Sequence, residues 1–379
     1  MGVSDTRAYA IMAKPVGSAC NLRCSYCYYI GKDKLFGRTE SMGYDVLKRY
    51  ISENIRIHGR RAAVEFAWHG GEPTLRGLDF YRRAMELQRE YGTGRKILNN
   101  IQTNGTFIDE EWCAFLRDNK FAVGLSVDGP EQLHDANRKG VKGDGSFSRA
   151  IDAARLFKKF GVPFNVLATV NSVNAGHPAE VYDLASSLSD FIQFLPVVER
   201  GGELITVPPG IHTADEDISV TPQSVSPESY GDFLCKIFDI WASRDVGEKF
   251  VQMFEAAIGN MTGRPAGICV HEAVCGHTAS LEADGSLYSC DRYTFDEYRL
   301  GNIMDSPLDE LMESNRAFGT HKAELTQECE ECRWLPLCRG GCPKDRFLPT
   351  ADGKYKNYLC AGYKKFFSHI AASVRFVKE

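Results

Sequence analysis

Hydrophobic and polar positions follow two different periods along residues 8–198. Short runs rich in β-branched and aromatic residues, each ending in small or polar residues, predict strands. They lie at residues 9–16, 62–70, 96–105, 121–129, 163–171 and 190–198. Between most of these runs, apolar residues recur at the spacing of an amphipathic helix. The predicted helices lie at residues 44–55, 78–92, 109–119, 147–161 and 178–188. This alternation is typical of a parallel sheet with crossover helices, and six units predict an α/β barrel, complete or partial.

Polar or cysteine-containing stretches directly follow the first four predicted strands. A loop with three cysteines follows the first strand, and "HGGEPT" at residues 69–74 follows the second. "QTNGT" at residues 102–106 and "SVDGP" at residues 126–130 end the third and fourth. In such barrels the active site lies at the carboxyl ends of the strands. We therefore expect these stretches to surround one site.

The pattern changes after the sixth strand. Residues 199–228 are rich in glycine, proline and acidic residues, and a connection of this length indicates either a cover over the active site or a solvated spacer. Helical patterns return at residues 227–243 and 249–260, and an amphipathic pattern at residues 363–378 closes the chain. We divide the chain into a barrel at residues 8–235 and a cysteine-rich domain at residues 236–379.

Composition narrows the functional classes. The 379 residues are 43% hydrophobic and 25% charged, with a net charge of -5, which is typical of a globular protein. There is no basic excess of the kind that favours nucleic acid. No apolar run approaches the ~18 residues of a membrane span, and the first residues lack the apolar stretch of a secretory signal. We therefore predict a cytoplasmic protein that binds neither nucleic acid nor membrane.

Thirteen cysteines are unusual for such a protein. Disulfides are rare in the cytoplasm, so the thiols indicate metal binding or redox chemistry. Three of them, Cys20, Cys24 and Cys27, lie close together, and eight lie between residues 269 and 360. Cys113 and Cys235 stand apart in predicted helices, where a lone cysteine is usually a small buried side chain.

The spacing C-x3-C-x2-C at residues 20–27 suits a four-iron cluster, because three thiolates leave one iron open to another ligand. A zinc site would need a fourth ligand, which His69 could supply, but the residues between these thiols do not resemble a zinc knuckle. The eight later cysteines make two sets of four. They allow two iron–sulfur cubanes or two zinc sites.

With Tyr26 before the third cysteine, "CNLRCSYC" resembles the signature of radical S-adenosylmethionine (SAM) enzymes. The resemblance implies that the open iron binds SAM, whose cleavage yields a 5′-deoxyadenosyl radical. "GGEPT" and "LSVDGP" resemble further stretches that contact SAM in this family. The SAM contacts implied by the family are Tyr26, Gly71, Ser126, Arg138 and Val198.

The late run C-x2-C-x5-C-x3-C with one further cysteine resembles the SPASM extension of radical SAM enzymes that modify peptides. The resemblance makes residues 8–235 a partial (β/α)6 radical SAM barrel and residues 236–379 a SPASM domain with a small β-hairpin and helices. It also implies two auxiliary [4Fe–4S] clusters. The first would be held by Cys269, Cys275, Cys290 and Cys342, and the second by Cys329, Cys332, Cys338 and Cys360. Proximity in the sequence would instead group the four cysteines from 329 to 342.

"ADGSLYSCDRY", together with the order of the other motifs from residue 9 to 365, resembles anaerobic sulfatase-maturating enzymes. The family implies oxidation of a cysteine or serine to Cα-formylglycine in a sulfatase polypeptide with the segment C/S-x-P/A-x-R. It also implies three [4Fe–4S] clusters and a low-potential one-electron donor such as flavodoxin or ferredoxin. Asp291 matches the general base of this family, whereas His69 stands where glutamine is expected, which leaves its role open.

Two alternatives remain at this point. Another SPASM peptide-modifying enzyme, which forms thioether or carbon crosslinks in a short precursor, would carry the same clusters. A non-enzymatic iron–sulfur electron carrier would use the thiols but would not cleave SAM.

Overall fold

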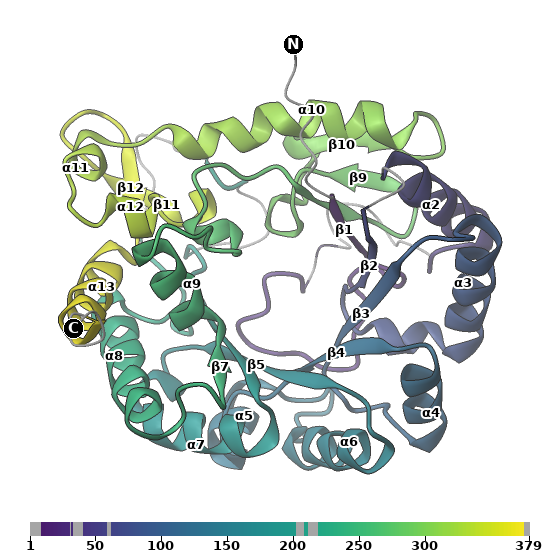
Figure 1. Ribbon diagram of the computed structural model, residues 1–379, viewed down its shortest axis with the longest axis horizontal. Helices are drawn as coiled ribbons and strands as arrows, with labels where there is room; N and C mark the ends of the chain where they lie inside the picture. Colours follow the sequence, from purple (N-terminus) through teal and green to yellow (C-terminus); the bar gives the residue numbers. More distant parts are fainter. Residues whose placement is uncertain are drawn as a thin grey trace.

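The computed structural model describes residues 9–30, 32, 41–58, 62–201, 208–210 and 219–374. The strands within these residues form one long sheet in the order β10-β9-β8-β1-β2-β3-β4-β5-β6-β7. Their bounds are β1 Ala10–Ala13, β2 Val64–Trp68, β3 Ile97–Thr103, β4 Phe121–Ser126, β5 Phe164–Val170, β6 Phe191–Pro196, β7 Phe250–Val251, β8 Thr278–Leu281, β9 Ser286–Tyr288 and β10 Arg299–Asn302. The strands from β1 to β7 pair in parallel, and β7 and β10 form the two ends. The sheet curves into a barrel whose end strands β7 and β10 do not pair with each other in the described residues (Figure 1), which is the partial barrel that the resemblance implies.

Helices cover the outer face of this curved sheet (Figure 1). Their bounds are α2 Tyr44–Ile57, α3 Leu78–Tyr91, α4 Glu110–Asp118, α5 Glu131–Asn137, α6 Phe147–Phe160, α7 Pro178–Leu188, α8 Pro227–Arg244 and α9 Gln252–Met261. Local signals fix several ends. Asp109 caps α4 by accepting from the Trp112 amide at 2.8 Å, and Gly161, at φ 70°, ends α6 in the left-handed region that glycine tolerates. Single 3₁₀ turns occur at Pro73–Arg76, Asn174–Gly176, Cys269–His271, Asp291–Tyr293, Asp296–Tyr298, His321–Ala323 and Pro343–Asp345.

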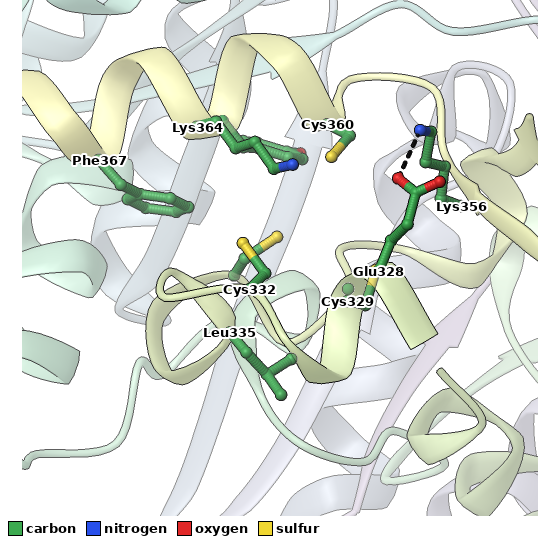
Figure 2. Close-up of a pocket in the computed structure, with 11 residues that line it drawn as sticks. Glu328, Cys329, Cys332, Leu335, Lys356, Cys360, Lys364 and Phe367 are labelled. Carbon is green, nitrogen blue, oxygen red and sulfur yellow. Dashed lines mark hydrogen bonds and ion pairs between the residues drawn. The ribbon is translucent and has the colours of Figure 1, made fainter. Parts of the chain in front are cut away.

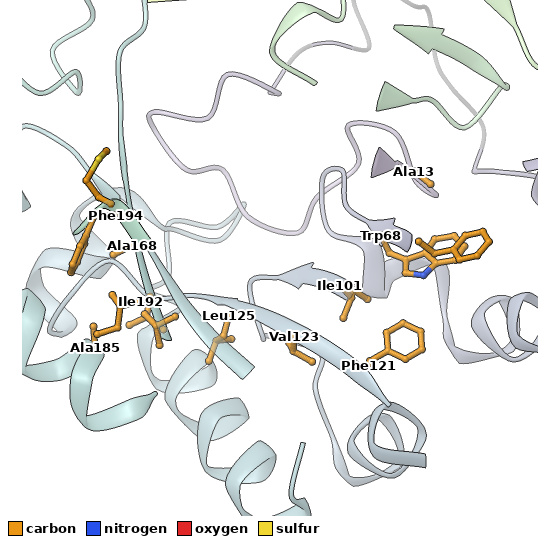
Figure 3. Packing of buried hydrophobic residues seen from close by; sticks show 14 of the residues in the cluster. Ala13, Trp68, Ile101, Phe121, Val123, Leu125, Ala168, Ala185, Ile192 and Phe194 are labelled. Atoms are coloured by element: carbon orange, nitrogen blue, oxygen red, sulfur yellow. The ribbon is translucent and has the colours of Figure 1, made fainter. Parts of the chain in front are cut away.

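The two faces of the strands have different side chains, because successive residues of a strand point to opposite sides. Toward the helices lie apolar side chains such as Trp68, Ile101 and Phe194, all buried (Figure 3). On the other face, Gln102 and Ser126 line a cavity. Gly124 leaves room there, since a Cβ at this position would meet Gln102 Oε1 at 2.0 Å. The main core therefore lies between sheet and helices, and the barrel interior is left for a site.

The cysteine-rich part is continuous with the barrel. β8 pairs in parallel with β1, and β8, β9 and β10 form an antiparallel meander. The remaining elements are α10 Leu308–Thr320, α11 Gln327–Glu330, α12 Leu335–Cys338, the hairpin of β11 Arg346–Pro349 and β12 Tyr355–Asn357, and α13 Cys360–Val374. α13 packs against α8. This is the small hairpin and helical domain that the resemblance implies. The boundary predicted between residues 235 and 236 falls within α8 and stays a prediction.

The helix predicted from residue 249 begins at Gln252, because Phe250 and Val251 pair with β6 as a short strand.

Much of the 199–228 segment lies outside the described residues, so the choice between a cover and a spacer stays open. Within the segment, the Thr221 backbone amide donates a hydrogen bond to the Glu199 carbonyl at 2.8 Å. In the described part of the chain, no helix is long and apolar enough to cross a membrane.

Candidate active site

A cavity of about 230 Å³ opens at the carboxyl ends of the barrel strands. It collects groups from the cysteine loop, from the turns after β2, β3 and β4, from the end of β6 and from the cysteine-rich part. Its chemically distinctive lining residues are Cys20, Cys24, Tyr26, Cys27, Tyr28, His69, Gly71, Gln102, Asn104, Ser126, Arg138, Asp291, Arg292 and Lys344. The structure thus gathers the four motifs that the sequence places after successive strands.

The cysteine loop is held against a neighbouring loop by backbone hydrogen bonds. The Arg23 amide donates to the Lys139 carbonyl at 2.7 Å, and the Ser25 amide donates to the Asn137 carbonyl at 3.1 Å. Burial raises the pKa of the Cys20 thiol to about 11 and that of Cys24 to about 12. Thiolates at these positions therefore need a strong positive charge beside them, which a metal cluster supplies.

The glycine turn after β2 packs directly on the cysteine loop. A Cβ on Gly71 would lie 2.0 Å from the Ala19 carbonyl oxygen, so a larger residue does not fit. The next residue, Glu72, is 1% exposed. Its carboxylate accepts hydrogen bonds from the Thr103 hydroxyl at 2.7 Å and from the backbone N–H of Asn104 at 2.8 Å. Gly71 and Glu72 therefore join the turns after β2 and β3 to the cysteine loop.

A buried ion pair fixes the residues that line the cavity beyond the end of β4. Asp128 is 0% exposed and accepts from Arg138 Nε at 2.9 Å through Oδ2. The Tyr26 hydroxyl donates to the same oxygen, and the Thr169 amide donates to Oδ1 at 2.9 Å. Ser126 accepts from Gln102 Nε2 at 3.0 Å. Asp128 is thus the common anchor of Tyr26 and Arg138.

Asp291 reaches the same cavity from the cysteine-rich part. Burial alone would raise the pKa of its carboxyl, but Lys14, Arg292 and His69, together with a hydrogen bond from Tyr28, lower that pKa to about 2. Burial, and then the Lys14 ammonium, lower the pKa of His69 to about 4. At neutral pH the cavity wall therefore presents a carboxylate and a neutral imidazole.

Cys269, Cys275, Cys290 and Cys342 come together near Asp291. Burial raises the pKa of the Cys290 thiol, and the nearby Asp291, Cys342 and Cys269 raise it further. Cys275 also lies near Cys269. The buried Lys322 faces this group and donates to the Val270 carbonyl at 2.8 Å. This set corresponds to the first auxiliary group implied by the resemblance.

The other four late cysteines line a small, separate cavity of about 20 Å³ between α11, α12 and the start of α13. Cys332 and Cys360 point toward one another across it (Figure 2). Burial raises the pKa of Cys338 to about 12, with an added contribution from the neighbouring thiols of Cys360, Cys329 and Cys332. Gly340 and Gly341, at φ 73° and 64°, turn the chain after α12, and Cys342 belongs to the first set. The structure therefore groups these thiols across the sequence order.

The described residues hold no group of three or more His, Cys, Asp or Glu side chains arranged around one metal ion. A cubane does not require that arrangement, because each thiolate binds a different iron. Cys113 is 0% exposed in α4, and Cys235 packs partly buried in α8, apart from both cavities.

One implied SAM contact is not brought to the cavity. The Val198 side chain packs in the hydrophobic core, 3% exposed, and the preceding Val197 lines the cavity instead. The Val198 carbonyl accepts from Lys344, which also pairs with Glu199 at 2.6 Å. A shift of one residue reverses the side of the chain that faces a ligand, and the sequence carries no signal for that shift.

Sequence reasoning also missed Tyr28 and Lys14. Tyr28 follows Cys27 directly, so a polar aromatic residue beside a ligand was the available signal. Lys14 follows β1 and is 0% exposed, with Nζ 3.8 Å from the centroid of the Tyr29 ring. Lysine is seldom buried this completely, and only the fold reveals that it is.

Comparisons with known proteins agree with this geometry. The model of the Radical SAM superfamily matches residues 15–185, and SPASM, an iron-sulfur cluster-binding domain, matches residues 273–333. A serine-type anaerobic sulfatase-maturating enzyme from Bacteroides thetaiotaomicron is 43% identical over 97% of this chain and 91% of its own. A cysteine-type anaerobic sulfatase-maturating enzyme from Clostridium perfringens is 35% identical over 95% of each chain.

Solved structures give the same result. The structure of native anSMEcpe with bound AdoMet and Kp18Cys peptide matches with a TM-score of 0.84 at 35% identity, over 97% of this chain and 98% of that one. Streptococcus suis SuiB bound to S-adenosylmethionine matches with a TM-score of 0.60 at 14% identity, which shows a shared fold alone.

Proposed function

Because the chain belongs to the anaerobic sulfatase-maturating enzymes of the radical SAM superfamily, we propose that it oxidises a cysteine or serine in a sulfatase polypeptide to Cα-formylglycine. One observation carries this proposal. A single cavity is lined by three thiols, by Arg138 from the barrel and by Asp291 from the cysteine-rich part. An electron carrier needs thiols, but it does not need a carboxylate and an arginine around an open cavity.

The residues present fit the cofactors of this family. Cys20, Cys24 and Cys27 reach the cavity as a set of three, which suits a cluster with one open iron. The other eight thiols form two sets of four, which suit two fully ligated clusters. When bound, SAM and its cluster supply a radical that removes a hydrogen atom from the substrate carbon, and the auxiliary clusters supply an acceptor for one electron. The chain's own residues bind SAM and the peptide, orient the reacting groups and accept the proton.

We assign these tasks as follows. Arg138, held by Asp128, and Ser126, held by Gln102, present fixed polar groups to SAM beside Tyr26. Gly71 lets the turn after β2 approach the cysteine loop. Val198 is left out of this set because its side chain lies in the core.

Asp291 is the proposed general base. It lies on the cavity wall beside Cys290, where the target residue must place its sulfur or oxygen. The carboxylate accepts the proton from that atom, and general-base catalysis contributes roughly 10²–10⁴-fold. Proton acceptance thus occurs beside a proposed cluster ligand, where an electron can also leave.

The proposed partners follow from this chemistry. The substrate is a polypeptide with the segment C/S-x-P/A-x-R, and named relatives of both the serine type and the cysteine type support either target. A low-potential one-electron donor such as flavodoxin or ferredoxin would reduce the cluster that cleaves SAM. Free thiols in this number suit the cytoplasm, which we keep as the proposed location.

The test is anaerobic incubation of the iron-loaded protein with SAM, dithionite and two matched peptides, one with cysteine and one with serine in the target segment. We expect 5′-deoxyadenosine together with an aldehyde-bearing peptide, detected by mass spectrometry and by hydrazide labelling. A crosslinked peptide without an aldehyde would support a different SPASM enzyme. The absence of SAM cleavage would contradict the proposal altogether.

A further inference from the structure

Tyr28 connects the two cysteine-containing loops that meet at the cavity. It directly follows Cys27, and its hydroxyl donates to Oδ2 of Asp291 at 2.7 Å. Asp291 in turn directly follows Cys290, and the two residues of the hydrogen bond are 263 positions apart in the sequence. Both side chains line the cavity. This hydrogen bond is therefore a direct link between the proposed SAM site and the proposed base.

Few groups hold the Asp291 carboxylate directly. Among the described residues, Tyr28 contacts Oδ2, and the Cys290 sulfur lies 3.3 Å from Oδ1. Lys14 and Arg292 act on the carboxylate through their charge. A cysteine that ligates a cluster has lost its proton, so the Cys290 sulfur cannot donate once iron is bound. The phenol of Tyr28 is then the donor that fixes the orientation of this carboxylate.

We propose that Tyr28 is a positioning residue that occupies Oδ2 of Asp291 and leaves Oδ1 directed at the target sulfur or oxygen. The inference rests on the proposed function. Oxidation removes one hydrogen atom from the substrate carbon, then one proton and one electron. The sulfur–hydrogen or oxygen–hydrogen bond breaks, the proton passes to Oδ1, and the electron would pass to an auxiliary cluster. A serine target thereby becomes the aldehyde. A cysteine target becomes a thioaldehyde, which water converts to the aldehyde with release of hydrogen sulfide. A carboxylate that can rotate spends less time in the orientation that accepts this proton.

The ring of Tyr28 has a separate role. It packs edge-on against Tyr29, with ring centroids 5.9 Å apart and an interplanar angle of 69°. A phenylalanine keeps this contact and removes only the oxygen. Tyr28→Phe therefore tests the hydrogen bond without opening a hole.

The experiment compares wild type, Tyr28→Phe and Tyr50→Phe. Tyr50 is the matched control. Its buried hydroxyl also donates one hydrogen bond, to the Ile11 carbonyl of β1 at 3.1 Å, but it lies in the hydrophobic core. We expect Tyr28→Phe to keep iron content, cluster spectra and 5′-deoxyadenosine formation within about twofold of wild type. Formylglycine formed per 5′-deoxyadenosine should fall by about 10- to 100-fold, with an unchanged peptide KM. Tyr50→Phe should keep the wild-type ratio.

Two further measurements separate positioning from a structural role. In the Asp291→Asn background, Tyr28→Phe should reduce the product ratio no further, because the two residues act as one unit. A crystal structure of Tyr28→Phe should show the Asp291 carboxylate rotated from its wild-type orientation.

A wild-type product ratio for Tyr28→Phe would overturn the inference, as would an equal loss in both backgrounds or the loss of a cluster. Wild-type protein that cleaves SAM but makes no formylglycine would instead contradict the proposed function. The two failures are therefore distinguishable.

Discussion

Asp128 shows how one buried carboxylate can control two groups at the cavity. Its Oδ1 accepts from the Thr169 amide, and its Oδ2 accepts from both Arg138 and Tyr26. In Asp128→Asn the side-chain oxygen will keep the hydrogen bond from the backbone N–H of Thr169. The side-chain NH2 group, which is itself a donor, will then face the donors of Arg138 and Tyr26. Removing one partner of a buried pair leaves the other charge uncompensated.

We therefore expect Asp128→Asn to raise the Kd for SAM by about 10-fold or more, which corresponds to losing one charge-assisted hydrogen bond. The measurement is titration of SAM against the iron-loaded protein, followed by the change in the cluster's electron paramagnetic resonance signal. Asp144→Asn is the control, because Asp144 pairs with Arg149 at the surface. An unchanged Kd with intact clusters would mean that Arg138 does not need this anchor.

Asp291→Asn separates radical formation from proton removal. The amide keeps the size of the carboxylate but cannot accept a proton. We expect three intact clusters and normal 5′-deoxyadenosine, with formylglycine reduced roughly 10²–10⁴-fold. Quantifying both products in one reaction checks this. Full formylglycine yield would make Asp291 structural, and loss of the cluster beside Cys290 would mean that the residue only holds that turn.

At this scale the sequence identifies residues whose chemistry is local. Three thiols within eight positions indicate a cluster without any fold, whereas the role expected of Asp291 came from the resemblance to the family. The sequence offers only a weak signal for Tyr28, its place beside Cys27, and none for Lys14, because both act on Asp291, more than two hundred positions away. Gly71 was expected to approach a ligand, and the structure adds a second reason, contact with the Ala19 carbonyl.

At the scale of elements, periodicity predicted the six barrel strands because each alternates between a core face and a cavity face. β7 was missed because two residues carry no period. The periodicity also did not predict the pairing of β8 with β1, because it joins segments that are far apart in the chain. The grouping of cysteines in the second domain came from the resemblance alone. Its physical basis is the glycine turn after α12, which separates Cys342 from its sequence neighbours.

The end of α10 offers an element-level test of the first auxiliary site. A Cβ on Gly319 would lie 2.0 Å from the Cys275 carbonyl oxygen, and the Cys275 amide donates to the Gly319 carbonyl at 3.2 Å. Gly319→Ala must therefore push the Cys275 loop away from the other three thiols. We expect the loss of about four irons from this site alone, measured by iron content and resonance spectra.

Ser314→Ala, at an exposed position of the same helix, should keep all the iron and controls for a general effect on α10. Unchanged iron in Gly319→Ala would mean that the Cys275 loop tolerates the displacement, or that Cys275 is not a ligand.

At the scale of the molecule, the cysteine-rich part completes the cavity. β8 extends the barrel sheet beside β1, and α13 packs on α8. Lys344 contacts Val198 and Glu199 in the segment that follows β6. Asp291 and Arg292 reach the cavity only because these contacts hold the two parts together. Groups from both parts therefore line one cavity, and the active site cannot be assigned to either predicted domain alone.

The metal content of the whole chain tests this arrangement most broadly. Eleven cysteines form three spatially separate groups, and each group suits one cubane, so anaerobically loaded protein should hold about twelve irons per chain. Replacing Cys20, Cys24 and Cys27 with alanine should remove about four irons and abolish SAM cleavage. Replacing Cys329 and Cys332 should also remove about four irons, but should leave SAM cleavage intact, because that cavity lies apart from the first. A Cys113→Ala control should lose none, since that thiol is buried in α4. Tightly bound zinc in the eight-cysteine region would contradict the cluster assignment, because a d¹⁰ ion cannot accept the electron that the proposed oxidation releases.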